Sequence, residues 1–170
     1  MASSAQRGAA RAPPPPDQLA SFYKLVDKSV IAGVLDRHAR HAELPAQAAV
    51  QAEALFGDDS LVVADLRISE SVALNNLAAE ASGAEQVALA RKSWTALLSL
   101  VALLLRRIEA NTLLPGTIRE DEVDYGAHAL AAIQKARTEP APPPALLRDW
   151  ASSMGYNTLL NAMVMSLNLL

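Results

Sequence analysis

Hydrophobic residues recur every three or four positions along most of the chain, a spacing that places them on one face of an α-helix. The first such stretch covers about residues 18–42, where Leu19, Phe22 and Val26 begin the apolar face and Asp17 can cap the first turn. No stretch shows the sustained alternation of hydrophobic and polar residues that is typical of a half-buried strand. The pattern therefore predicts an all-α protein.

Glycine, proline and capping residues divide the rest of the chain into further helices. Pro45 suits the first turn of a second helix, because its missing N–H group is not needed there, and Gly57 suits the position just after its end. The run Thr117-Ile118-Arg119-Glu120 matches a capping box and marks the start of a fifth helix. The predicted helices after the first cover about residues 45–56, 60–82, 84–109 and 118–136.

Four of these helices are about 20 to 27 residues long and are joined mostly by short connections, so neighbours in sequence are expected to pack antiparallel. The helix at 84–109 contains the most apolar run of the chain, residues 97–105, and is expected to be the central helix. That run is shorter than the roughly 20 residues that span a bilayer. We therefore predict a bundle of four long antiparallel helices with additional short helices and no membrane span.

Residues 1–16 differ in composition from the rest of the chain. They contain no acidic residue and end in four consecutive prolines, which favour an extended polyproline conformation. We predict a disordered tail here and the helical bundle at residues 17–137. The tail lacks the apolar core of a secretory signal, so we expect a cytoplasmic protein; its Ser, Ala and Arg content leaves the alternative that residues 1–16 are part of an organelle-targeting segment.

A second proline-rich stretch, residues 138–145, predicts an extended spacer before two short helices. With the preceding residue it also fits the order Arg-x-x-Pro-x-x-Pro of a polyproline ligand, in which the arginine meets an acidic groove and the prolines dock on aromatic side chains. The candidate partner-binding residues in this stretch are Arg137, Pro140 and Pro143.

The C-terminal segment, residues 146–170, has no charged residue after Asp149. Its last helix carries apolar residues over more than half of its circumference, and leaving them in water costs several kcal/mol at about 25 cal/mol per Å² of apolar area. We therefore expect this segment to pack on the bundle, on a partner protein or on a second copy of the chain. The candidate partner-binding residues are Leu159, Leu160, Met163, Val164, Leu167 and Leu170.

Composition and charge narrow the possible functions. The 170 residues, of which 51% are hydrophobic, correspond to one globular domain. With 15 basic and 18 acidic residues the chain has a net charge of -3 and no global basic field for nucleic acid. The absence of cysteine excludes thiolate chemistry and cysteine-ligated zinc, and the seven isolated glycines cannot form a phosphate-binding loop. We expect no catalytic residue, no cofactor and no metal.

Two clusters of titratable residues have simpler explanations than a chemical site. His38 and His41 lie three residues apart and could share a metal, but no third ligand is evident, and cations are favoured at the C-terminal end of the first predicted helix. The acidic residues of the second cluster lie at the start of the fifth helix, where negative charge and capping account for them. These residues are Glu120, Asp121, Glu122 and Asp124.

The run Leu74-Asn75-Asn76-Leu77-Ala78, followed by Gly83 and Ala88, resembles part of a tetratricopeptide repeat of the kinesin-light-chain kind. The resemblance covers about 30 residues, in a family whose repeat of 34 residues is a pair of helices. It implies that this part of the chain is a fragment of a helical repeat, which is one alternative for the fold and function.

These patterns predict a non-enzymatic interaction, scaffold or assembly module that binds a protein partner or self-associates. The alternative from another class is a small helical ligand-binding protein or enzyme with a cavity between the long helices, which would use His38, His41 or the acidic start of the fifth helix. A cavity with two convergent titratable groups favours this alternative. A filled core with an exposed apolar patch favours the interaction module.

Overall fold

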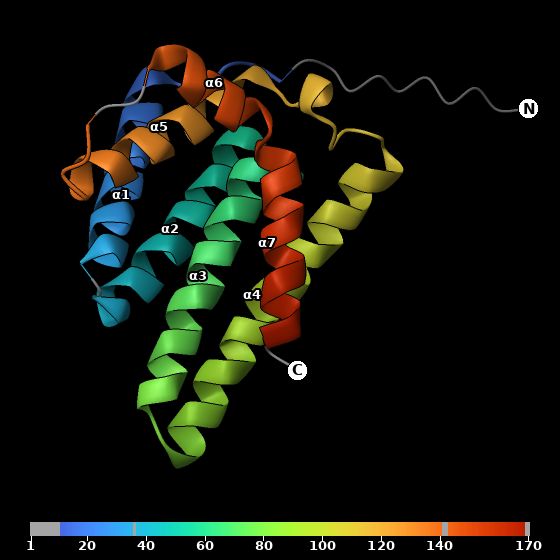
Figure 1. The fold of residues 1–170 in the computed structure, drawn as a ribbon. Coiled ribbons are helices and arrows are strands. Elements are labelled where there is room, and N and C mark those ends of the chain that lie inside the picture. The colour runs from blue at the N-terminus through green and yellow to red at the C-terminus, as the bar shows by residue number, and fades with distance from the viewer. Residues whose placement is uncertain (1–10, 36, 141–142, 169–170) are drawn as a thin grey trace, which may run out of the picture.

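The computed structural model describes residues 11–35, 37–140 and 143–168, which form seven α-helices and one short 3-10 turn without any strand (Figure 1). The predicted all-α fold is confirmed. The helices are α1 (Pro16–Val34), α2 (His38–Phe56), α3 (Leu61–Glu80), α4 (Gly83–Glu109), α5 (Glu120–Ala136), α6 (Pro144–Ser152) and α7 (Met154–Asn168), and the 3-10 turn is η1 (Pro115–Thr117).

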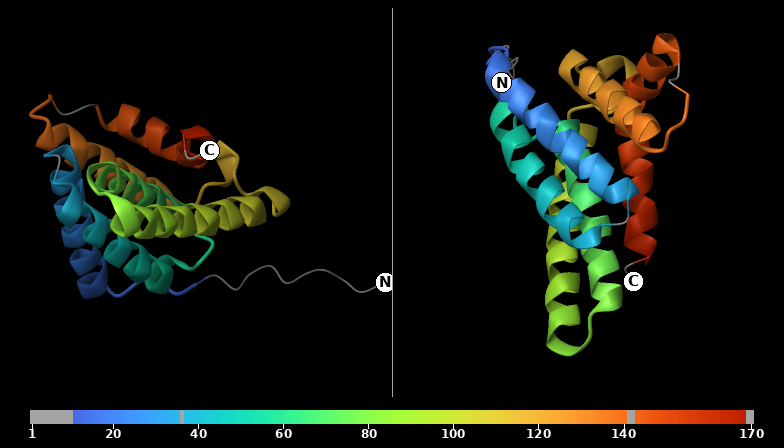
Figure 2. Two further views of the ribbon diagram at one scale, coloured as in Figure 1. Left: turned by 90° about the horizontal axis from the view of Figure 1, so that it is seen from below. Right: turned by 90° about the vertical axis from the view of Figure 1, so that its left-hand side faces the viewer.

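Helix α3 lies at the centre of the structure. It packs most extensively against α2 and α4 and also contacts α5 and α7, so that it lies between α2 on one side and α7 on the other (Figure 2). The four residues of its first turn, 61–64, are all buried, as expected of a helix that is covered on every side. The prediction that the helix with the apolar run 97–105 is central was wrong, because that run lies in α4, which covers only one side of α3.

The predicted first helix, residues 18–42, is two helices in the structure. α1 ends at Val34 and α2 begins at His38, so the chain turns where the apolar spacing had suggested continuity. At Gly33 an added Cβ atom would lie 2.9 Å from the imidazole of His41, and this glycine therefore allows the two helices to approach closely at the turn. Pro45 consequently lies inside α2, where it is buried, and not in its first turn as predicted.

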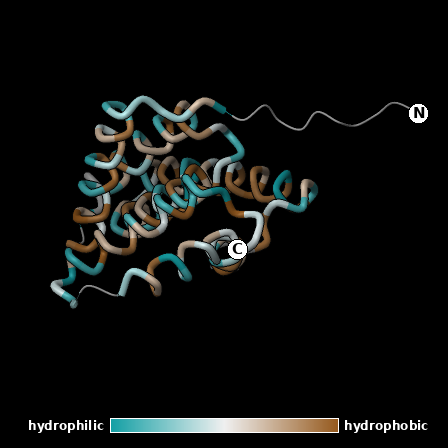
Figure 3. The backbone as a smooth tube through the Cα atoms, turned by 90° about the horizontal axis from the view of Figure 1, so that it is seen from above, coloured by the Kyte–Doolittle hydropathy of each residue, from teal (hydrophilic) through white to brown (hydrophobic). Residues whose placement is uncertain are grey.

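Aromatic side chains hold α1, α2 and α5 together. The rings of Phe22 and Phe56 meet edge to face with centroids 5.4 Å apart, and the ring of Tyr125 lies 6.1 Å from Phe22. All three side chains are at most 4% exposed. Most helices carry both hydrophobic and polar segments within each turn, as amphipathic helices do (Figure 3).

A buried carboxylate joins the ends of three helices. Glu122, in the first turn of α5, is completely buried, and its Oε1 lies 2.8 Å from Nη1 of Arg107 in the last turn of α4. The same oxygen accepts the backbone N–H of Leu61, the first residue of α3, at 2.9 Å. The other oxygen accepts the N–H of Arg119 at 3.0 Å. Glu122 therefore satisfies backbone donors that α3 and α5 cannot satisfy within their own first turns.

Arg107 completes this cluster on the opposite side. Its guanidinium donates to the carbonyl oxygen of Thr112 from both Nε and Nη2 and to that of Asp59 from Nη1, in addition to its bonds to Glu122. The side chain is buried, and each of its nitrogens has a partner. This arrangement fixes the loop after α4 to the loop before α3.

The capping box of α5 lies two residues later than predicted. Thr117 lies in η1 and donates its hydroxyl to the carbonyl of Leu114, whereas Glu122 is the acid that bonds back to the N-cap residue, Arg119. Since a guanidinium has no acceptor, only half of the reciprocal box forms. The prediction was wrong because Glu120 matches the motif by spacing but is exposed.

The two short helices that follow the proline-rich stretch are α6 and α7. Gly155 is the second residue of α7 and is buried. A Cβ atom there would lie 2.9 Å from the carbonyl oxygen of Leu113, so the glycine permits a close crossing of backbones. Pro144 already belongs to α6, so helix begins inside the predicted spacer, while residues 141 and 142 lie outside the described residues.

We predict that Glu122→Ala lowers the free energy of unfolding by about 3–5 kcal/mol, because it leaves the buried Arg107 without a counter-charge and two backbone N–H groups without an acceptor. Glu120→Ala is the matched control on the same turn. Glu120 pairs with Arg148 at the exposed surface, so its loss is expected to change the free energy of unfolding far less. Urea denaturation of both variants measures the difference, and equal effects would contradict the role given to Glu122.

Candidate functional site

Helix α4 has two apolar faces. One face packs on α3 and includes Leu97, Leu100 and Leu104, which are at most 2% exposed. On the other face, the large side chains are between 39% and 55% exposed, apart from Val101, which is partly buried. They follow one another at alternating steps of four and three from Trp94 onward, which is the heptad spacing of a coiled-coil seam. This set, called the α4 seam below, consists of Val87, Trp94, Leu98, Val101, Leu105 and Ile108.

The predicted partner-binding residues of the last helix lie beside the C-terminal half of this seam (Figure 1). Leu160, Met163 and Val164 are 50% or more exposed, whereas Leu159 is half-buried and packs on the core. The structure does not describe the side chain of Leu167, and Leu170 lies outside the described residues.

A groove of about 330 Å³ separates α4 from α7. Its lining contains no charged residue, and it is continuous with the seam through Val101, Leu105 and Ile108. The residues that line this α4–α7 groove are Val101, Leu104, Leu105, Ile108, Leu159, Ala162 and Met163.

The structure does not bring the other candidate partner-binding residues to this surface. Arg137 follows α5 directly and lines a different cavity, and Pro140 and Pro143 are exposed. Since residues 141 and 142 between the prolines are not described, the polyproline-ligand hypothesis stays a prediction.

In the described residues α4 is the one helix long and apolar enough to cross a membrane by length and composition, and 33% of its most apolar window is buried. Its two apolar faces together produce this property. Core helices of soluble proteins pass the same test, and the predicted absence of a membrane span stays a prediction.

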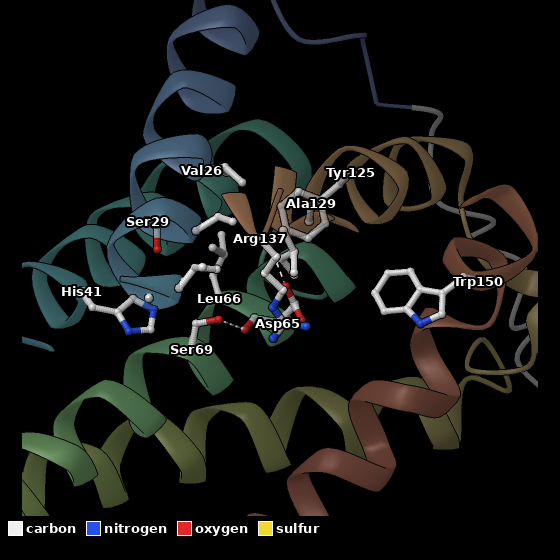
Figure 4. Close-up of a pocket in the computed structure, with 14 residues that line it drawn as sticks. Val26, Ser29, His41, Asp65, Leu66, Ser69, Tyr125, Ala129, Arg137 and Trp150 are labelled. Carbon is white, nitrogen blue, oxygen red and sulfur yellow. Dashed lines mark hydrogen bonds between the residues drawn. The ribbon is translucent and has the colours of Figure 1, made fainter. Parts of the chain in front are cut away.

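A second cavity, of about 270 Å³, lies among α1, α2, α3, α5 and α6 (Figure 4). Asp65 of α3 faces it, and the hydroxyl of Tyr125 donates to Oδ2 of Asp65 at 2.7 Å. Ser69 donates to the carbonyl oxygen of Asp65 at 3.2 Å. The other polar or aromatic side chains that line the cavity are Ser29, His41, Arg137 and Trp150.

The carboxyl group of Asp65 is in an unfavourable environment for a charge. Burial raises its pKa above the usual 3.8, and the hydrogen bond from Tyr125 opposes the rise only in part. No cationic side chain of the described residues forms an ion pair with it. Burial and the neighbouring carboxylate also raise the pKa of Tyr125 well above 10, which keeps its hydroxyl protonated and able to donate.

Among the described side chains, the members of the titratable clusters named from the sequence have different surroundings. Of the histidine pair, His41 lines the Asp65 cavity, while the side chain of His38 lies outside the described residues. Of the acidic cluster, Glu122 is buried in its ion pair and Glu120 bonds to Arg148. Among the described residues no group of three His, Asp or Glu side chains is arranged to hold a metal ion.

Sequence reasoning missed both Asp65 and Arg107. Asp65 is the one acidic residue in the apolar stretch 61–66, and it lies four residues after Leu61 and four before Ser69, on one face of α3. Arg107 falls on the same stripe as Leu100 and Leu103. In both cases the signal was a polar residue in register with a buried face.

No protein-family model matches this chain, and neither the curated proteins nor the solved structures contain a match to it. The hairpin formed by α3 and α4, of 20 and 27 residues, is also too long for a tetratricopeptide repeat of 34 residues.

We predict that Asp65→Asn raises the midpoint of thermal unfolding at pH 7 by a few degrees. The amide oxygen can still accept the hydrogen bond from Tyr125, while the cost of a buried charge disappears. The native pKa of Asp65 is raised, so wild-type stability from this group falls as pH rises from 3.8 through the native pKa. The advantage of the variant should therefore vanish when the pH is lowered below 3.8, where the wild-type carboxyl is neutral in both states.

Thermal unfolding of both proteins at pH 7 and at low pH measures this difference. Ser69→Ala, which changes a neighbouring hydroxyl without removing a charge, is the control. A gain for Asp65→Asn that persists unchanged at low pH would show that burial of the charge is not its cause.

Proposed function

We propose that this protein is a non-enzymatic interaction module that self-associates through the α4 seam and the α4–α7 groove. The observation that carries the proposal is the exposed apolar stripe of α4 from Trp94 to Ile108, which continues onto α7 at the α4–α7 groove. A helix with a second apolar stripe in water is typical of a helix that packs against another helix.

The exposure of this surface favours a second folded copy as its occupant. The large apolar side chains of the seam other than Val101, together with Met163 at the groove, are each between 39% and 59% exposed, which is more than the singly scattered hydrophobic residues of an ordinary monomer surface. Pairing this surface with itself buries it on both copies at once.

The spacing of the seam is self-complementary in an antiparallel arrangement. When two copies of α4 are centred between Ser99 and Leu100, each residue meets the one for which the two sequence numbers add to 199. Leu98 then meets Val101 of the second copy, and Trp94 meets Leu105 of the second copy. Since Leu105 lines the α4–α7 groove, the register directs the indole of each copy toward a groove large enough to receive it.

Charge supports the same register. The seam is interrupted by a charged residue at Arg91, which in this arrangement lies next to Ile108 and Glu109 of the second copy. Arg91 and Glu109 are both exposed and lie on either side of the stretch 94–108, so two symmetry-related pairs of opposite charge flank the apolar centre. A parallel arrangement would place Arg91 beside Arg91 instead, which is unfavourable.

We predict that the wild-type protein is a dimer and that Leu98→Asp raises its dissociation constant by about 100-fold or more. Each copy then contributes one carboxylate to the apolar centre, and each costs at least about 1.4 kcal/mol. Leu98 is 55% exposed, so the variant should fold. Val50→Asp, at a 61% exposed position on α2, is the matched control that should leave the dimer intact. Sedimentation velocity across a concentration series gives the constants.

A charge swap tests the register. Glu109→Arg alone and Arg91→Glu alone should each weaken the dimer, whereas the double variant should recover part of the loss because the opposite charges face one another again. A wild-type protein that remains monomeric at the highest concentration of the series would contradict self-association. If the losses of the two single variants add up in the double variant, the antiparallel register would be contradicted, but self-association would not.

A further inference from the structure

The Asp65 cavity presents opposite charges that do not pair with each other. Asp65 lies on one wall and Arg137, just after the end of α5, lines the same cavity (Figure 4). Neither side chain forms an ion pair with any described residue. A half-buried carboxylate and an exposed guanidinium at one cavity are suited to a ligand that carries both charges.

The surroundings of Asp65 fit an ammonium group. Oδ1 of Asp65 is not used in a hydrogen bond with any described residue, and the oxygen of Tyr125, which donates to Oδ2, still has acceptor capacity. Ser29 is 4% exposed and its hydroxyl makes no hydrogen bond within the described chain. Asp65 and Tyr125 thus present two neighbouring oxygens to a group with three N–H donors such as an ammonium, and Ser29 lines the same cavity.

The remaining walls are aliphatic and the space is small. Val26 and Val30 of α1 line one side of the cavity, and Leu66 and Ile133 line another. A volume of about 270 Å³ holds roughly nine non-hydrogen atoms at the packing of liquid water. This limits the ligand to a short aliphatic body between its two charged ends.

From this geometry we propose that the cavity binds a small aliphatic amino acid, with the ammonium on Asp65 and the carboxylate on Arg137. The site lies away from the α4 seam, so the binding does not depend on the proposed self-association. It adds a ligand-binding function to the interaction module, and it accounts for a carboxylate that the fold would otherwise bury at a cost.

The test measures binding of three probes to the full chain by isothermal titration calorimetry: L-leucine with both charges, isoamylamine with the ammonium alone, and isovalerate with the carboxylate alone. We expect leucine to bind at least about tenfold more tightly than isoamylamine and isovalerate to bind weakest, because Asp65 repels it. Failure of leucine to bind at millimolar concentration, or equal affinity for leucine and isoamylamine, would overturn the proposal.

Two variants assign the charges. Asp65→Asn should weaken leucine binding at least about tenfold, and Arg137→Gln should lower the affinity for leucine to that for isoamylamine. Arg148→Gln, at an exposed arginine that pairs with Glu120, is the control and should bind as the wild type does. Leucine binding that survives Asp65→Asn would overturn the proposal. The dimerisation variant Leu98→Asp should still bind leucine, which separates this site from the proposed interface.

Discussion

The fold depends on one buried ion pair at the end of the α3–α4 hairpin. Glu122 and Arg107 lie where α3 begins, α4 ends and α5 begins, and between them they bond to the backbone of every one of these ends. Burying two charges is unfavourable unless the remaining donors and acceptors are satisfied. Here the backbone groups satisfy them, and the same groups would be without partners if the pair were replaced by hydrocarbon.

This constraint explains why α5 can cross the start of α3. The first turn of α5 carries Glu122 and, three residues later, Tyr125 follows on the same face. This face reaches Leu61 and then Asp65, which are four residues apart on α3. Two polar contacts therefore set the rotation and the height of α5 on α3. The Asp65 cavity exists because this register places the next residues of α5, among them Ala129, opposite the valines of α1.

Local sequence signals predicted helices well and their contacts poorly. The predicted helices at 60–82 and 84–109 are present almost unchanged as α3 and α4. The boundary at residues 35–38 was missed because Gly33 acts through contact with His41, which the local pattern does not reveal. The exposed face of α4 was missed for a different reason: a run of leucines supplies two stripes, and hydropathy alone does not tell which stripe has a partner.

The candidate sites were predictable only in part for the same reason. The apolar character of Leu160, Met163 and Val164 was evident from the sequence, but the neighbouring α4 seam became evident only once α7 was placed beside it. The cavity around Asp65 combines side chains from five helices, and its hydrogen bond joins residues 60 positions apart. No local pattern encodes such a distance.

Gly155 has a consequence for the shape of the molecular surface. Because this residue has no side chain, α7 descends onto the carbonyl of Leu113 and its next turns reach α4 at their present separation. A Cβ atom at this position would lie too close to the carbonyl oxygen of Leu113, so a larger residue would require α7 to move away from it. The absence of a side chain at Gly155 thus influences the spacing between α4 and α7 over several turns, including at residues that Gly155 does not contact.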